Sequence, residues 1–450
     1  MTSLFSKGGN ILLQLLAMPL AYEALGSERF GIFGILQTVM WLIYMSDMGM
    51  GGGISRRFTL VTAHGNRREQ TRVFCSGFFA TLTLAAVFGL FLAAVLLVVP
   101  VERLFGEAFR HHSAELTLNL WLGLGIFLCM VMAGTFLRIR EGCQELHVFN
   151  LFGAAGNIVA AVMLVVGIRG CPQVWFLLLA LYGVQLATWT FNAVHVLWHR
   201  RWLVPRWAGV DFTLVRLLFL EGLAFFVVFS IAPVLEREGL RLLIGRDSGP
   251  EAVGLFSILT QLGFFILGFS IMLTAPLAPA ITDAFSHRDF AWLKSLHRRV
   301  LAAGAVALVA IPGGLALLGP RFVDIWMRRD IPLGPVELAA YGTFFALALW
   351  SNVHCILLCA CGFLRQAAMV AAVECAVVLA AGWAGLGRGG MTGALWAAAA
   401  GMAALSFWIL PLLFRSRLAA EIAEASGRQK TCSPPEASVI AAPQTPSMQP

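Results

Sequence analysis

Residues 26–36 read GSERFGIFGIL, and residues 249–259 read GPEAVGLFSIL. Six of the eleven aligned positions are identical, and each copy precedes a long apolar segment. Because the copies stand about half a chain apart, we predict two homologous halves. Three of the six identical pairs favour structural roles, namely a left-handed turn, an acidic group near a helix N-terminus and close helix packing. These positions are Gly26, Glu28, Gly31, Gly249, Glu251 and Gly254.

The composition indicates a membrane protein. Of the 450 residues, 59% are hydrophobic and 12% are charged, and the mean hydropathy is +0.81. Soluble domains carry roughly 25% charged residues, so this chain has too little polar surface for a water-soluble globule. The net charge of +8 is spread over short clusters between apolar segments. That distribution argues against a nucleic-acid partner and is typical of a multi-pass protein with basic cytoplasmic loops.

The apolar segments predict an all-α protein with twelve membrane-spanning helices, since each span needs about 20 mainly apolar residues. If the N-terminus is inside, 21 of the 32 Lys and Arg residues fall on the same side, which favours cytoplasmic placement of both termini. The expected spans are about 8–25, 30–54, 73–99, 116–137, 149–168, 174–198, 213–236, 252–280, 300–319, 336–361, 367–387 and 391–414.

The duplication predicts two six-helix lobes of the same topology. Such parallel repeats enclose a central cavity, which is exposed to each side of the membrane in turn as the lobes rock. We expect an N-lobe at 1–205, a C-lobe at 206–417 and a disordered cytoplasmic tail at 418–450, where Pro, Ser and Ala dominate.

The phrase LGSERFGIF, followed by Asp47, Gly49 and Gly51 in a D-x-G-x-G pattern, is similar to a known family. It resembles the polysaccharide flippases of the multidrug/oligosaccharidyl-lipid/polysaccharide exporter superfamily, and the resemblance covers about residues 1–415. It implies an inner-membrane carrier that moves a polyprenyl-pyrophosphate-linked oligosaccharide, or a similar glycolipid, from the inner to the outer leaflet for cell-surface polysaccharide synthesis. Membrane lipids and polysaccharide-assembly proteins are the further partners considered.

Ionisable side chains inside the apolar spans are candidate functional residues, because a charge in the bilayer is costly. His354 and Glu374 are expected at equal depth in adjacent antiparallel spans, with Asn352 nearby. We hypothesise that His354 and Glu374 form a proton-binding pair that couples transport to the proton gradient. The alternative is a neutral Glu374 that hydrogen-bonds between helices.

Five further residues are candidates for ion or substrate contacts. Asp47 is expected to cap a break in the second span, beside glycines that allow bending. Arg56 and Arg57 end that span on the cytoplasmic side, where they could bind a pyrophosphate headgroup or simply be orienting charges. Glu221 could bind a sugar hydroxyl or a cation, or pair with an arginine. Arg241 is a further candidate for substrate contact.

We expect no catalytic residues, no metal site and no cofactor. The nine cysteines form no framework, and CILLCAC (355–361) lacks partners at zinc spacing. The chain is therefore predicted to be a transporter, not an enzyme. Two alternatives stay open: an ion-coupled multidrug or toxic-compound antiporter of the same superfamily, and an integral-membrane glycosyltransferase or polymerase. The enzyme would need a large outer loop, whereas all connectors here are short.

Overall fold

The computed structural model describes residues 2–63, 66–274 and 277–431, which form helices and short connectors. The first half of the chain contains α1 (Thr2–Tyr44), the 3-10 turn η1 (Met45–Asp47), α2 (Met50–Ala63), α3 (Arg67–Val98), α4 (Val101–Phe105), the 3-10 segment η2 (Glu107–His112), α5 (Ser113–Gly142), α6 (Leu146–Gly167), α7 (Val174–Leu178), the π-helical η3 (Leu179–Gly183) and α8 (Val184–His199).

The second half begins after two short 3-10 turns, η4 (Arg201–Leu203) and η5 (Trp207–Gly209). It contains α9 (Phe212–Phe226), the π-helical η6 (Val227–Ile231), α10 (Ala232–Thr274), α11 (Leu277–Ser286), α12 (Phe290–Met327), α13 (Pro335–Ala360), α14 (Leu364–Ala404) and α15 (Ser406–Thr431).

Glycines divide the three longest helices. Gly26 in α1 has φ 77°, Gly249 in α10 has φ 82° and Gly390 in α14 has φ 54°, so each helix turns at a residue in the left-handed region. Only glycine adopts that region without steric cost. Within the described residues, eight helical stretches are long and apolar enough to cross a membrane. Two of them, Val227–Gly268 and Leu364–Glu424, turn at Gly249 and Gly390, and each therefore supplies two membrane helices. Together with the two halves of α1 they give twelve membrane helices, six in each half of the chain.

The two copies of the repeated sequence pack against each other. A Cβ atom on Gly31 would lie 1.7 Å from the Pro250 carbonyl oxygen, and one on Gly254 would lie 3.3 Å from the Ser27 carbonyl oxygen. The Ser27 hydroxyl also donates to Glu251 at 2.7 Å. The repeat therefore brings α1 and α10 together backbone to backbone. In the structure Gly26 and Gly249 have positive φ, and Gly31 and Gly254 lie in the contact between the lobes.

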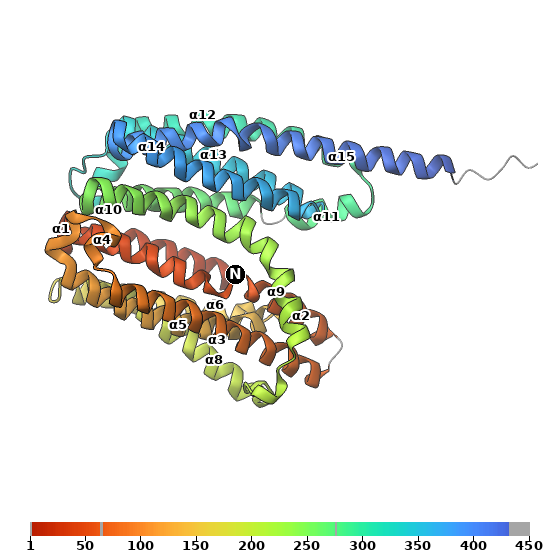
Figure 1. Ribbon diagram of the computed structural model, residues 1–450, viewed down its shortest axis with the longest axis horizontal. Helices are drawn as coiled ribbons and strands as arrows, with labels where there is room; N and C mark the ends of the chain where they lie inside the picture. The colour runs from red at the N-terminus through yellow and green to blue at the C-terminus, as the bar shows by residue number, and fades with distance from the viewer. Residues whose placement is uncertain (1, 64–65, 275–276, 432–450) are drawn as a thin grey trace, which may run out of the picture.

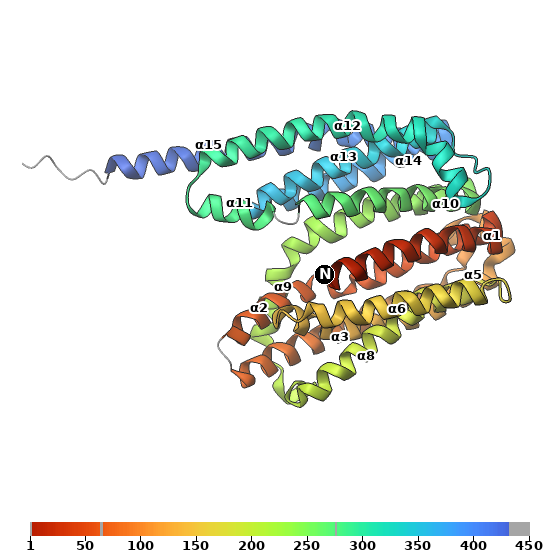
Figure 2. The same cartoon turned by 180° about the vertical axis from the view of Figure 1, so that it is seen from behind.

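The lobes meet along α1 and α10, at the left in Figure 1, and diverge toward the right, where α2 and α11 lie. The junction has an apolar core that contains Ile35, Leu36 and Phe256, all fully buried. Seen from behind, α1 and α6 form one wall of the first lobe, while α12 and α13 cover the second (Figure 2). The N-terminal end of α1 lies on the side where the lobes diverge, as do α2 and α11. The fold is therefore the two-lobe, twelve-helix architecture that the sequence predicted.

Two of the predicted boundaries differ from the structure. The helix α9, placed by sequence in the second lobe, packs against α2 of the first. Their backbones touch, since a Cβ atom on Gly53 would lie 2.5 Å from the Leu218 carbonyl oxygen. At the other end, α15 continues past residue 418 to Thr431, so the start of the predicted tail is helical. Leu418 is buried against the second lobe, which explains the continuation. Residues 432–450 lie outside the described part.

The second predicted span is interrupted rather than continuous. After α1 ends at Tyr44, Met48 (φ 47°) and Gly49 (φ 81°) turn the chain before α2 begins at Met50. The Asp47 carboxylate accepts hydrogen bonds from the backbone N–H groups of Gly49 (3.1 Å) and Gly51 (3.3 Å). Asp47 thus caps the break as expected, and the bend lies before the glycine run, most of which is helical.

Candidate functional site

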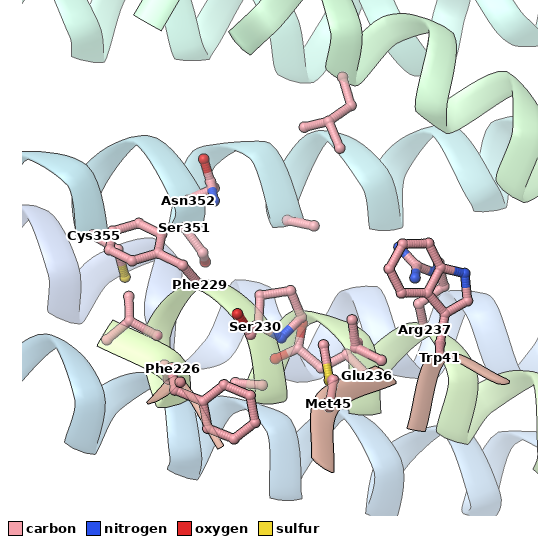
Figure 3. A pocket seen from close by; sticks show the side chains of 18 of the residues that line it. Trp41, Met45, Phe226, Phe229, Ser230, Glu236, Arg237, Ser351, Asn352 and Cys355 are labelled. Carbon is pink, nitrogen blue, oxygen red and sulfur yellow. The ribbon is translucent and has the colours of Figure 1, made fainter. Parts of the chain in front are cut away.

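A cavity of about 760 Å³ lies between the lobes. The first lobe contributes residues of α1, η1, α2 and α5, and the second contributes residues of η6, α10, α13 and α14, with α9 lying between them. Most of the lining is aromatic or aliphatic (Figure 3). Its acidic and basic side chains are few: Asp47, Arg56, Arg138, Glu236, Arg237 and Glu374. An apolar cavity with few, convergent polar groups is the usual form of a ligand site.

On the first lobe the cavity wall is mainly cationic. Arg56 of α2 and Arg138 of α5 line it together with Asp47. The Asp47 carboxylate accepts the hydrogen bonds from the backbone N–H groups after η1. Arg138 also donates to Glu141 at 3.0 Å, three residues along α5. Both arginines belong to the part of the lobe remote from the α1–α10 junction. This wall can therefore attract an anion near the wide end of the cavity.

The end of α5 that carries Arg138 is anchored by a neighbouring ion cluster. Arg140, 3% exposed, donates to Glu145 at 2.9 Å and to Asn192 at 3.0 Å. Arg200 pairs with the same carboxylate. Glu145 lies in the turn between α5 and α6, and hydrogen bonding from Arg200 holds the pKa of its carboxyl below the usual value. The cluster ties α5, α6 and α8 together and so positions the cationic wall.

On the second lobe the cavity wall carries two carboxylates. Glu374 of α14 accepts hydrogen bonds from the hydroxyls of Ser351 (2.6 Å) and Ser406 (2.7 Å), which lie on α13 and α15. Glu236 of α10 lines the same cavity and is close enough to Glu374 for the two to interact electrostatically. Both side chains are nearly buried, at 6% and 4% exposure. Two adjacent carboxylates in a poorly solvated place favour a shared proton or a bound cation between them.

The cavity is closed at one end by polar contacts between the lobes. Glu238 and Arg241 of α10 form a 2.6 Å ion pair, and each side chain is at most 3% exposed. From the first lobe, the Thr38 hydroxyl donates to Glu238 at 2.7 Å, and the Gly34 carbonyl accepts from Arg241 at 3.4 Å. A buried charge pair needs such additional hydrogen bonds to be stable. These groups therefore form a seal that exists only while α1 and α10 are together.

The predicted pairing of His354 with Glu374 is wrong. The two residues occur at similar depth, but the His354 ring faces α12, with its centroid 5.7 Å from that of His297, and its Nδ1 lies 2.8 Å from the Trp350 carbonyl oxygen. Equal depth does not bring two side chains together when they point to different faces of their helices. Asn352, by contrast, lines the cavity as a member of the predicted group.

The other predicted contacts divide in the same way. Arg56 and Asp47 line the cavity, whereas Arg57 and Arg241 are not among its lining residues, and Arg241 belongs to the seal. The side chain of Glu221 lies outside the described part of the structure. Sequence analysis placed Arg241 in an outer connector because the seventh span was ended at residue 236, while α10 continues as helix to its turn at Gly249.

Sequence analysis did not name most of the lining residues, among them Arg138, Glu236, Arg237 and Ser351. The first three lie at or just beyond the ends of the predicted spans 116–137 and 213–236. The closely spaced charges at 236–241 were the available signal, because four ionisable residues within two helical turns next to an apolar span fit a lipid-facing helix poorly.

No family model matches the sequence. Among curated proteins, the chain is 22% identical over 343 residues to the "Putative O-antigen transporter" of Escherichia coli strain K12, covering 70% of this chain and 74% of that protein. It is 20% identical over 415 residues to the "Putative O-antigen export protein" of Yersinia pseudotuberculosis, covering 90% and 93%. The chain is thus a distant relative of proteins named as O-antigen transporters, which agrees with the expectation of a transporter.

Solved structures share the fold. An inward-facing multidrug-resistance MATE family transporter of the MOP superfamily aligns over 94% of this chain and 96% of its own, with TM-score 0.71 and 15% identity. An outward-facing structure of a transporter with the same description aligns with TM-score 0.61 over 93% and 94%, at 16% identity. A further structure, of a MOP superfamily transporter from Pyrococcus furiosus, aligns with TM-score 0.56 over 93% and 94%, also at 16% identity. The present arrangement of the lobes is more similar to the inward-facing structure.

Proposed function

We propose that this chain, which has the fold of the MOP-superfamily transporters, flips a polyprenyl-pyrophosphate-linked oligosaccharide from the inner to the outer leaflet of the cell inner membrane. The observation that carries the proposal is the cavity between the lobes, which combines a cationic wall with many aromatic rings. The names of the distant relatives support the same substrate class. Delivery of that glycolipid to the outer leaflet would serve cell-surface polysaccharide synthesis.

In this proposal the three parts of the substrate meet three environments. The pyrophosphate binds Arg56 and Arg138 at the wide end of the cavity, since guanidinium groups bind phosphate oxygens in pairs. The sugars extend toward the narrow end, where Trp41 and Phe264 line the wall. The prenyl chain stays in the lipid. With both termini in the cytoplasm, as the distribution of Lys and Arg predicts, the wide end faces the cytoplasm.

Coupling to an ion gradient is assigned to Glu236 and Glu374. They replace the predicted pair of His354 and Glu374, since they share the cavity and interact with each other. Their proton or cation could be exchanged with water whenever the cavity is open. Because α10 carries Glu236 as well as half of the seal, loss of the cation and rearrangement of the seal involve the same helix.

The test is transport of a fluorescent prenyl-pyrophosphate-linked oligosaccharide in proteoliposomes, read as its loss of accessibility to a reagent on one side. Wild-type protein is expected to move the lipid, and Arg56→Gln/Arg138→Gln is expected to slow it at least about tenfold, the loss of one charge-assisted contact or more. The matched control is Arg298→Gln, an exposed arginine on α12 that does not line the cavity. In cells, deletion of the gene should leave lipid-linked glycans on the cytoplasmic leaflet. Equal rates for the double variant and the wild type would refute the role of the cationic wall.

An ion-coupled multidrug antiporter is the second candidate. It is favoured by the two carboxylates, which could bind an organic cation, and by the multidrug transporters among the similar structures. Export of a lipophilic cation such as rhodamine by the proteoliposomes, in the absence of glycolipid movement, would select this candidate.

A further inference from the structure

The narrow end of the cavity holds an arginine that is fixed from three directions. The Arg237 guanidinium carbon lies 4.7 Å from the centroid of the Phe264 ring and 5.9 Å from that of Trp41, and its Nε donates to Glu238 at 2.7 Å. Trp41 belongs to α1 and Phe264 to α10, so rings from the two halves of the chain hold one cation. Arg237 and Trp41 lie together at the edge of the cavity (Figure 3).

This arginine still has donors to offer a ligand. Its Nε donates to Glu238, no hydrogen bond within the described part of the chain uses its terminal nitrogens, and the side chain is 18% exposed. Positive charge is in excess here, because Arg237 and Arg241 share the single carboxylate of Glu238. The adjacent Glu236 projects about 100° away around the helix and interacts with Glu374 instead. A held guanidinium with a free edge fits a carboxylate or a phosphate.

The distance along the cavity decides which anion could reach Arg237. Arg241, one helical turn away on α10, is in the seal, so Arg237 lies at the closed end. Trp41 and Arg56 are separated by 15 residues, on the order of 20 Å if the path were one straight helix, and somewhat less with the break at η1. A pyrophosphate held at Arg56 and Arg138 therefore leaves Arg237 to the sugars that extend ahead of it.

We infer that Arg237, Trp41 and Phe264 form a subsite for a sugar that carries a carboxylate, so that the transported glycan is acidic. The inference rests on the proposed function and specifies its substrate class. The sugar ring lies against Trp41, which is 36% exposed, while its carboxylate accepts from the terminal nitrogens of Arg237. An uncharged sugar at this position would displace water from the guanidinium edge without supplying an anionic partner, which is the source of the discrimination.

The experiment measures binding to the full-length protein in detergent by isothermal titration calorimetry. The probes are two lipid-free tetrasaccharides that differ only in one terminal residue, glucuronic acid or glucose, and farnesyl pyrophosphate as a sugar-free anion. Wild-type protein is expected to bind the acidic tetrasaccharide at least about tenfold more tightly, equivalent to about 1.4 kcal/mol. Arg237→Gln should remove this preference and leave farnesyl pyrophosphate binding unchanged, since Glu238 keeps Arg241 and Thr38 as partners.

Two further variants make the result specific. Arg237→Lys keeps the charge and should lose most of the preference, because an ammonium lacks the planar fork. Arg246→Gln, an exposed arginine on the same helix, should behave as wild type. The subsite is refuted if Arg237→Gln retains the preference, if Arg237→Lys retains it in full, or if Arg237→Gln weakens only farnesyl pyrophosphate. If farnesyl pyrophosphate does not bind at all, the proposed function fails; if it binds without any preference for the acidic glycan, only the subsite fails.

Discussion

Thr38→Val tests whether the buried seal sets the balance between the two orientations of the carrier. The Thr38 hydroxyl donates 2.7 Å to the Glu238 carboxylate across the junction of α1 and α10, and both side chains are buried. Valine has nearly the same shape but no donor. A hydrogen bond to a charged group contributes about 1.5–3 kcal/mol. If the bond exists only in the sealed state, its loss shifts the equilibrium toward the opposite state by about 10- to 150-fold.

The shift can be measured by cross-linking the two copies of the repeat, which also meet where α1 and α10 touch. The Ser27 hydroxyl and the Glu251 carboxylate are 2.7 Å apart, one on each half of the repeat. In a background without native cysteines, a short thiol-reactive cross-linker should join Ser27→Cys to Glu251→Cys in the sealed state, and should do so more slowly after Thr38→Val. The control is Thr343→Val, whose hydroxyl donates only to Ala339 within α13. Unchanged cross-linking in Thr38→Val would show that the Thr38–Glu238 hydrogen bond of the wild type either is present in both states or contributes nothing. Either result would refute the reasoning.

Three further predictions concern the α1–α10 junction, the Glu145 ion cluster and the cavity carboxylate Glu374. Gly31→Ala places a methyl group 1.7 Å from the Pro250 carbonyl oxygen, so the seal cannot close and the cross-link should be lost together with transport. Glu145→Gln should lower the free energy of unfolding by about 1–3 kcal/mol near neutral pH, because buried Arg140 loses its charged partner. As the folded-state pKa of Glu145 is lowered, this stabilisation is present above its unfolded pKa and is lost as the pH falls through the folded value, so thermal unfolding of the two proteins should converge in acid. Glu374→Gln should make transport insensitive to the proton gradient.

Controls for these three predictions come from the same lobes. Gly313→Ala, with no atom within 4 Å of the added methyl, should preserve the cross-link and transport. His354→Gln should keep its response to the proton gradient, because the ring faces His297 and not the cavity. A gradient-insensitive His354→Gln together with a normal Glu374→Gln would reverse the assignment of the coupling residue. If Glu145→Gln lowered the free energy of unfolding by the same amount at every pH, the ionised carboxylate would not be the source of the stabilisation.

The sequence by itself determined the class of protein, the number of membrane helices and the duplication. These are short-range properties: apolar runs of spanning length, charges between them and a repeated turn with glycine at a positive φ. The functions of Gly26 and Gly249 follow from local backbone sterics, which any fold must satisfy. The ends of the membrane helices were harder to predict from the charges. A helix can continue past its apolar run when a partner helix covers its polar residues, as α10 does through Glu238 and Arg241.

Only the tertiary structure decided which side chains meet. Position along two helices gives depth but not direction, so His354 and Glu374 share a level and face different neighbours, while Glu236, far from Glu374 in sequence, shares the cavity with it. The same holds for Arg237, which lies between two rings from opposite halves of the chain. Which faces of the helices point inward depends on how the lobes pack around the α1–α10 junction, and that packing sums many contacts between residues remote in the chain.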